Sequence, residues 1–134
     1  MPRADLELLE DNDRQPMQAH RRLGRLIQSL SRRGFQDTLL PPFQPDLYLE
    51  DGDDLSHFGV NAQVVALPGH TAGSIGLKTE DGALLVGDAM SRLSSPAPAL
   101  VYADRRQMED SVAKIWALHP TALYFGHGRP AQGL

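Results

Sequence analysis

The sequence predicts an α/β or α+β domain in which helices pack against one mixed β-sheet. Residues 16–33 and 104–118 place apolar side chains at helical spacing. Short apolar runs typical of buried strands lie between and after them, and turns rich in Gly and Asp separate these runs. A length of 134 residues is usual for one domain, so we expect residues 1–134 to form a single domain.

The first 45 residues are expected to hold a short strand, a helix and an irregular connection. Residues 4–9 have the composition of a short strand. A helix is expected from Pro16 to about Arg33, with Gly34 as its stop. Three prolines predict an irregular connection over residues 38–45. The apolar side of the helix consists of Leu23, Leu26, Ile27 and Leu30.

The remaining residues are expected to form mainly strands. The predicted strands are residues 46–50, 62–67, 74–78, 83–86 and 122–125, with turns at 51–53 and 80–82. Pro96 and Pro98 predict a loop. The second helix, residues 104–118, would have an apolar side formed by Val112, Ile115, Trp116 and Leu118.

Composition excludes several classes of function. The absence of cysteine rules out disulfides, thiolate metal sites and a thiol nucleophile. The formal net charge of −4 argues against nucleic acid as a partner, so the arginine-rich helix is interpreted as a solvated face. The sequence has no apolar run of the kind found in signal peptides or membrane spans, so we expect a cytoplasmic location and no membrane partner.

A repeated pattern of residues points to a metal site. Three short apolar strands are each followed by Gly and then by a ligand-type residue, namely His70, Asp88 and His127. Gly lets the backbone leave a sheet sharply, and zinc, iron and manganese accept imidazole nitrogen and carboxylate oxygen. Each position alone is more commonly a turn residue. The hypothesis of a site therefore depends on the three strands being neighbours.

Three segments resemble metallo-β-lactamase-fold hydrolases, a group that includes glyoxalase II-like thioesterases and lactonases. The segment Leu-Pro-Gly-His-Thr-Ala-Gly-Ser at residues 67–74 resembles the family's PGHTxGS motif. Residues 84–89 resemble the strand that ends in its metal-bridging Asp, and residues 124–130 resemble its late Gly-His-Gly segment. Residues 45–55 look like the hairpin before PGHT. Residues 45–130 thus match the C-terminal half of the family's αββα fold.

The resemblance implies roles for particular residues. His70 would bind one metal, Asp88 would bridge two, and His127 would bind the second. Thr71 and Ser74 would shape the loop beside the site. The metal would be zinc, or else iron or manganese.

The chain departs from the family because the H-x-H-x-D-H motif of the family's first half is absent. Only two ligands would remain for each metal, fewer than the three of a catalytic zinc site. We therefore expect the metal to be absent or weakly bound, and we assign no catalytic residue. His20, His57 and His119 are interpreted as structural or exposed residues.

Two functions remain open. The chain is either part of a metal-dependent hydrolase of esters, thioesters or lactones, completed by another chain, or a non-catalytic half-domain that associates with itself or a partner. One half of a two-sheet fold would leave an apolar sheet face uncovered. We therefore expect a homodimer or a complex with a complementary first-half chain.

Overall fold

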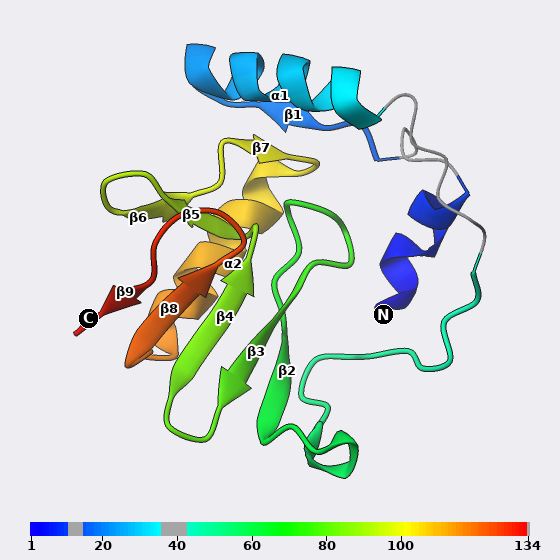
Figure 1. Cartoon of the computed structure of the whole chain (residues 1–134), viewed down its shortest axis with the longest axis vertical. Helices are drawn as coiled ribbons and strands as arrows, with labels where there is room; N and C mark the ends of the chain where they lie inside the picture. The colour runs from blue at the N-terminus through cyan, green and yellow to red at the C-terminus, as the bar shows by residue number, and fades with distance from the viewer. Residues whose placement is uncertain (11–14, 36–42, 134) are drawn as a thin grey trace.

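A mixed five-stranded sheet forms the centre of the molecule (Figure 1). The computed structural model describes residues 1–10, 15–35 and 43–133. The strands lie in the order β2 (Ala62–Ala66), β3 (Ile75–Thr79), β4 (Ala83–Gly87), β8 (Ala122–Phe125) and β9 (Ala131–Gln132). Among these five strands, β4 and β8 are the pair that runs in parallel. The prediction of one mixed sheet with flanking helices is confirmed.

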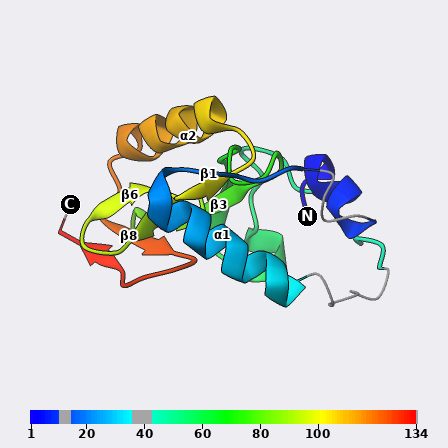
Figure 2. The ribbon, with the colours of Figure 1, turned by 90° about the horizontal axis from the view of Figure 1, so that it is seen from above.

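One face of the sheet is covered by α2 (Arg105–Ala117), which connects the β7 region to β8 (Figure 2). The Asp104 side chain caps this helix by accepting a 2.9 Å hydrogen bond from Gln107 N. Ile115 is completely buried in the core, whereas Trp116, which we expected on the same side, is 40% exposed. The buried cluster consists of Val65, Leu67, Leu84, Val86, Ala89, Met90, Ile115, Leu123 and Ala131.

The opposite face of the sheet carries a row of apolar residues in register. Leu77 pairs with Val64 on one side and Leu85 on the other, and Leu85 pairs with Tyr124. Successive side chains of a strand point to opposite faces, so these residues face away from the buried cluster that contains Leu84 and Leu123. Leu85 is 40% exposed and Tyr124 is 39% exposed. An apolar part of this face is therefore open to solvent.

The N-terminal region differs from our predictions. Residues 3–9 form a 3-10 helix, η1 (Arg3–Leu9), instead of a strand, and none of the described strands pairs with them. A two-residue strand, β1 (Gln18–Ala19), pairs with β7 (Val101–Tyr102) where we expected the first turn of the helix. The helix itself, α1, runs over Arg21–Phe35 and so includes Gly34. The expected irregular connection lies largely outside the described residues.

The apolar side of α1 faces outward. Leu23, Leu26, Ile27 and Leu30 are between 38% and 61% exposed. The helix contacts the rest of the molecule at Gly24, where a Cβ would lie 2.7 Å from the carbonyl oxygen of Leu100, and at Gln28, whose side chain donates to Met17 O. In Figure 1 the helix lies beyond the end of the sheet, on the side where β4 ends. None of the helices in the described part of the chain is long and apolar enough to cross a membrane.

Several short elements were not predicted, and a second predicted strand is absent. Residues 46–50 form no strand; within this segment Leu49 N donates to Met1 O at 3.1 Å and Glu50 N donates to Asp53 Oδ2 at 2.7 Å. The expected loop around the prolines contains a hairpin of β5 (Met90–Arg92) and β6 (Pro96–Pro98). A further 3-10 helix, η3, covers Ser56–Phe58. Strands of two or three residues are too short to show periodicity.

Asp51 links the turn before β2 to α2, and this link predicts a pH dependence of stability. Its Oδ1 accepts hydrogen bonds from Ala66 N at 2.7 Å and from Lys114 Nζ at 2.9 Å. The Ala66 bond, followed by the Lys114 bond, lowers the pKa of Asp51 from its ordinary value of 3.8. The stabilisation is therefore complete above that ordinary value and is lost as pH falls through the lowered folded-state pKa.

We expect Asp51→Asn to reduce the acid dependence of the free energy of unfolding. Urea unfolding of both proteins from neutral pH down to strongly acidic pH measures this dependence. Identical slopes for wild type and variant would contradict the prediction.

Candidate metal centre

The loop after β2 holds His70 against the start of α2. Gly69 has φ +134°, and a Cβ there would lie 2.3 Å from Met108 N, so only glycine fits. The Gly69 carbonyl accepts hydrogen bonds from Ala103 N at 2.8 Å and Asp104 N at 3.0 Å. Hydrogen bonds at Gly69 therefore hold the backbone in place directly before His70.

The His70 ring has a fixed orientation. Its Nδ1 lies 2.9 Å from the carbonyl oxygen of Val101, and a carbonyl only accepts, so Nδ1 carries the proton. In a neutral ring the lone pair is then on Nε2, which lies 3.9 Å from Oδ2 of Asp88. A histidine that binds a metal through one nitrogen almost always donates its other N–H in this way. This orientation directs Nε2 of His70 toward Asp88, as the predicted ligand role requires.

Asp88 and His127 are brought together by the parallel pairing of β4 with β8. Parallel strands end at the same edge of a sheet, and Gly126 N donates to Gly87 O at 2.9 Å at this edge. His127 Nε2 lies 3.7 Å from Oδ1 of Asp88. The side chain of His127 is 85% exposed, compared with 36% for Asp88. His127 therefore lies at the open rim of the site.

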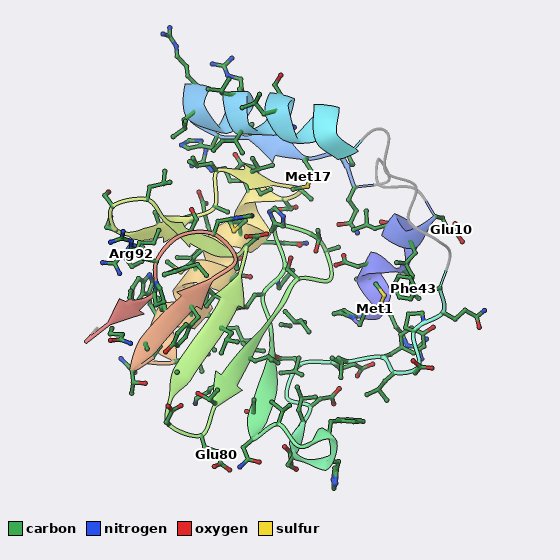
Figure 3. The ribbon with its side chains drawn as sticks, in the orientation of Figure 1. Met1, Glu10, Met17, Phe43, Glu80 and Arg92 are labelled. Atoms are coloured by element: carbon green, nitrogen blue, oxygen red, sulfur yellow. The ribbon has the colours of Figure 1, made fainter. Side chains whose placement is uncertain are left out.

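The segment around His127 is supported by β5. Arg92 forms a bridge with Gly128, and Arg92 N donates to His127 O at 3.4 Å. The Arg92 side chain, labelled in Figure 3, also donates through Nη1 to the carbonyl oxygen of Pro130. The predicted loop that became the β5–β6 hairpin therefore has a role beside the site.

The structure brings together all three residues that the sequence singled out. Each imidazole faces a different oxygen of the Asp88 carboxylate, at 3.9 and 3.7 Å. These separations are too long for hydrogen bonds. They are closer to the separation of about 3.4 Å expected between two ligand atoms on a tetrahedral zinc ion than to a normal hydrogen-bond distance. The donor types and the orientation of His70 fit a metal.

The site is nevertheless incomplete. Within the ranges that the structure describes, no group of three or more His, Cys, Asp or Glu side chains is arranged as a ready metal site. His57 and His119 are exposed, and His20 is half-buried just before α1. None of these three forms an ion pair with Asp88 in the described part of the chain. Metal binding by His70, Asp88 and His127 remains a prediction.

Sequence reasoning missed two residues beside the site, Asp5 and Gln15. Both form hydrogen bonds with the loop that follows His70. Their distance from that loop along the chain exceeds 50 residues in each case, so no local pattern could indicate the contact. Thr71 and Ser74 do shape this loop, as expected, because Thr71 N donates to Ser74 Oγ at 2.9 Å.

Gly126→Ala tests how closely Asp88 is held. A Cβ at position 126 would lie 2.3 Å from Oδ1 of Asp88, which is the end of a side chain that can rotate away. We expect this variant to lose only about 1–3 kcal/mol of its free energy of unfolding. The carboxylate of Asp88 should turn away from His127. Zinc titration followed by calorimetry, together with urea unfolding, separates the two effects. Unchanged zinc binding would contradict this geometry.

Known proteins with similar sequences are named as hydrolases. No protein-family model matches the chain. It is 36% identical over 85 residues to the probable metallo-hydrolase YflN of Bacillus subtilis, and 34% identical over 86 residues to a hydroxyacylglutathione hydrolase of Pseudomonas putida. The matches take in 52% and 61% of this chain and 32% of each relative. The chain therefore spans about a third of the length of the curated relatives it matches.

Two solved structures share the fold. A metallo-β-lactamase family protein of Thermus thermophilus matches 97% of this chain, over 46% of its own length, with a TM-score of 0.63 and 22% identity. A second protein, solved in a di-iron-bound form, matches 85% of this chain, over 58% of its own length, with a TM-score of 0.58 and 24% identity. These matches confirm the fold resemblance that the sequence predicts.

Proposed function

We propose that this chain, which has the fold of metallo-β-lactamase superfamily proteins and is similar in sequence to metallo-hydrolases, is the metal-binding part of a hydrolase of esters, thioesters or lactones. The proposal rests on one observation: at the edge of the sheet, one oxygen of the Asp88 carboxylate faces Nε2 of His70 and the other faces Nε2 of His127. The relative named as a hydroxyacylglutathione hydrolase supports an acylated thiol as one substrate class.

The residues present would divide the work of holding a metal. His70 would supply a neutral imidazole nitrogen, because Val101 accepts its other N–H. Asp88 would supply negative charge from both oxygens, one toward each imidazole. When bound, the metal would polarise a carbonyl group and activate water. The exposed rim at His127 leaves this position open to a substrate from solvent.

The proposed metal is zinc, with iron or manganese as alternatives that the same nitrogen and oxygen donors accept. The neighbour of similar fold that was solved in a di-iron-bound form supports iron as one of these alternatives. Two protein ligands per ion would give weak binding. We therefore propose that a second polypeptide supplies the missing ligands when the site is active.

Zinc titration of the purified protein tests the proposal. We expect measurable uptake in calorimetry but less than stoichiometric zinc after dialysis, because the ligand set is incomplete. Hydrolysis of a model thioester should stay low and should vanish with a chelator. Failure to take up zinc, iron or manganese would exclude the metal site. Retention of two zinc ions per chain would show that the ligand set is complete.

A second candidate is a non-catalytic module that binds another chain through its uncovered sheet face. The in-register row that ends in Leu85 and Tyr124, together with the outward side of α1, gives two exposed apolar surfaces. Monomeric proteins rarely expose large contiguous apolar patches. A homodimer, or a complex with a complementary first-half chain, would cover about 800 Å² per partner if the interface has standard size.

Light scattering at micromolar concentration tests this candidate. We expect a dimer, and we expect Leu85→Lys to convert it into a monomer. Leu93→Lys is the matched control, because Leu93 is 75% exposed outside the row. A monomeric wild-type protein would exclude self-association and leave only the complementary chain.

A further inference from the structure

We propose that Asp5 and Gln15 are positioning residues that fix the 71–74 loop and thereby aim His70 at Asp88. The loop consists of residues 71–74, directly after His70. The expected effect on metal affinity rests on the proposed function. The fixing of the loop by Asp5 and Gln15 does not depend on it. The two residues come from the N-terminal segment, on either side of residues that are not described.

Asp5 and Gln15 supply acceptors for three successive residues of the loop. Oδ2 of Asp5 accepts from Thr71 Oγ1 at 2.8 Å, and Oδ1 accepts from Gly73 N at 2.7 Å. Gln15 Oε1 accepts from Ala72 N at 2.7 Å. Gln15 is only 7% exposed, and its amide nitrogen donates to Ala4 O at 3.0 Å and to Asp5 Oδ1 at 3.3 Å. Gln15 therefore supports Asp5 as well as the loop.

The hydroxyl groups in the loop have a single consistent direction. A carboxylate only accepts, so the Thr71 hydroxyl donates to Asp5. In the 2.8 Å contact between the two hydroxyls, Ser74 must then be the donor to Thr71. Ser74 Oγ in turn accepts from Thr71 N at 2.9 Å. The carboxylate of Asp5 thus determines which hydroxyl group donates and which accepts within the loop.

The contact with Asp5 also explains why residue 73 is glycine. Gly73 is not among the glycines with positive φ, so its backbone conformation does not require glycine. A Cβ at this position would instead lie 2.6 Å from Cγ of Asp5. The second glycine of the Pro-Gly-His-Thr-Ala-Gly-Ser segment therefore makes room for a carboxylate from another part of the chain.

His70 lies between two anchored segments. On one side, the carbonyls of Gly69 and His70 both accept from Ala103 N, at 2.8 and 3.0 Å. On the other side, the 71–74 loop is held by Asp5 and Gln15. Without the second anchor the backbone after His70 would move, and the contact of its ring with Val101 would loosen. Groups that orient a metal ligand from behind typically change metal affinity by about 10- to 100-fold.

Cobalt(II) titration of the full chain tests the metal consequence, with Asp5→Ala, Asp5→Asn and Gln15→Ala as variants. We expect Asp5→Ala to weaken cobalt binding by about 10-fold and to alter the cobalt absorption spectrum. Asp5→Asn should have a smaller effect, because its amide oxygen still accepts from Gly73 N. Asp54→Ala is the matched control, since Asp54 accepts two hydrogen bonds from Ser56 at the start of η3, outside the site. It should leave cobalt binding unchanged.

NMR of the metal-free protein tests the hold on the loop independently. In Asp5→Ala and Gln15→Ala we expect faster amide exchange at Ala72 and Gly73, and a ring-nitrogen spectrum of His70 that shows mixed tautomers. If the wild-type protein binds no cobalt, the proposed function fails while these spectra still decide the positioning role. If Asp5→Ala does not fold, Asp5→Asn and Gln15→Ala give the decision. Variants that lose stability but keep the wild-type His70 spectrum and cobalt affinity would overturn the proposal.

Discussion

Gly69→Ala is expected to lower the free energy of unfolding by about 3 kcal/mol or more. A side chain at φ +134° is strained, which costs on the order of 1–3 kcal/mol. Its Cβ would also meet backbone atoms of Met108 at 2.3 and 2.4 Å, and a helix backbone cannot rotate away as a side chain can. The loop and α2 would have to separate, at a further cost of about 1–3 kcal/mol.

Gly59→Ala is the matched control for this prediction. Gly59 also has positive φ, +78°, but an added Cβ would meet nothing within 4 Å. We expect this variant to cost only about 1 kcal/mol, from backbone strain alone. Urea unfolding of both variants measures the difference. Equal losses of stability would mean that the close approach of Gly69 to α2 is not what requires glycine.

Asp88→Asn is expected to have the largest effect on metal binding. Both imidazoles face the Asp88 carboxylate, so removing its charge affects both halves of the proposed site. Changes behind a ligand cost about 10- to 100-fold in affinity, and changing the ligand itself should cost at least about 100-fold. Because the wild-type site is expected to bind weakly, zinc uptake by the variant should fall below detection.

Calorimetric titration with zinc checks this result, and Asp81→Asn is the control. Asp81 lies in the exposed turn before β4, where it accepts a hydrogen bond from Ala83 N at 3.4 Å. The control should bind zinc as the wild type does. Wild-type affinity in Asp88→Asn would mean that zinc binds elsewhere on the chain.

The predicted strands that proved correct share a physical basis. Residues 62–66, 83–87 and 122–125 each carry a run of apolar side chains next to a turn, and such runs are buried in almost any α/β arrangement. The three ligand-type residues come within four residues of the ends of these strands, so their positions were predictable once the strands were. Their meeting at one edge depended on the β4–β8 pairing, which the sequence alone does not fix.

The N-terminal region was predicted less well because its conformation depends on distant contacts. Asp5 has its partners at Thr71 and Gly73, and without them residues 4–9 show only the composition of a strand. The periodicity of α1 predicted a helix correctly. Periodicity does not say which side of a helix meets the molecule, and here the contacts include Gly24 and Gln28 instead of the apolar side.

The parallel pairing of β4 with β8 also has a consequence for folding kinetics. An antiparallel neighbour such as β3 can join β4 through a short turn. By contrast, β8 can pair with β4 only after the whole segment that contains α2 has closed back onto the sheet. Contacts of this kind form slowly because loop closure must precede them. Asp88 and His127 would therefore meet late in folding, and cobalt absorption in a stopped-flow experiment should appear after the tryptophan signal of Trp116 in α2 has changed.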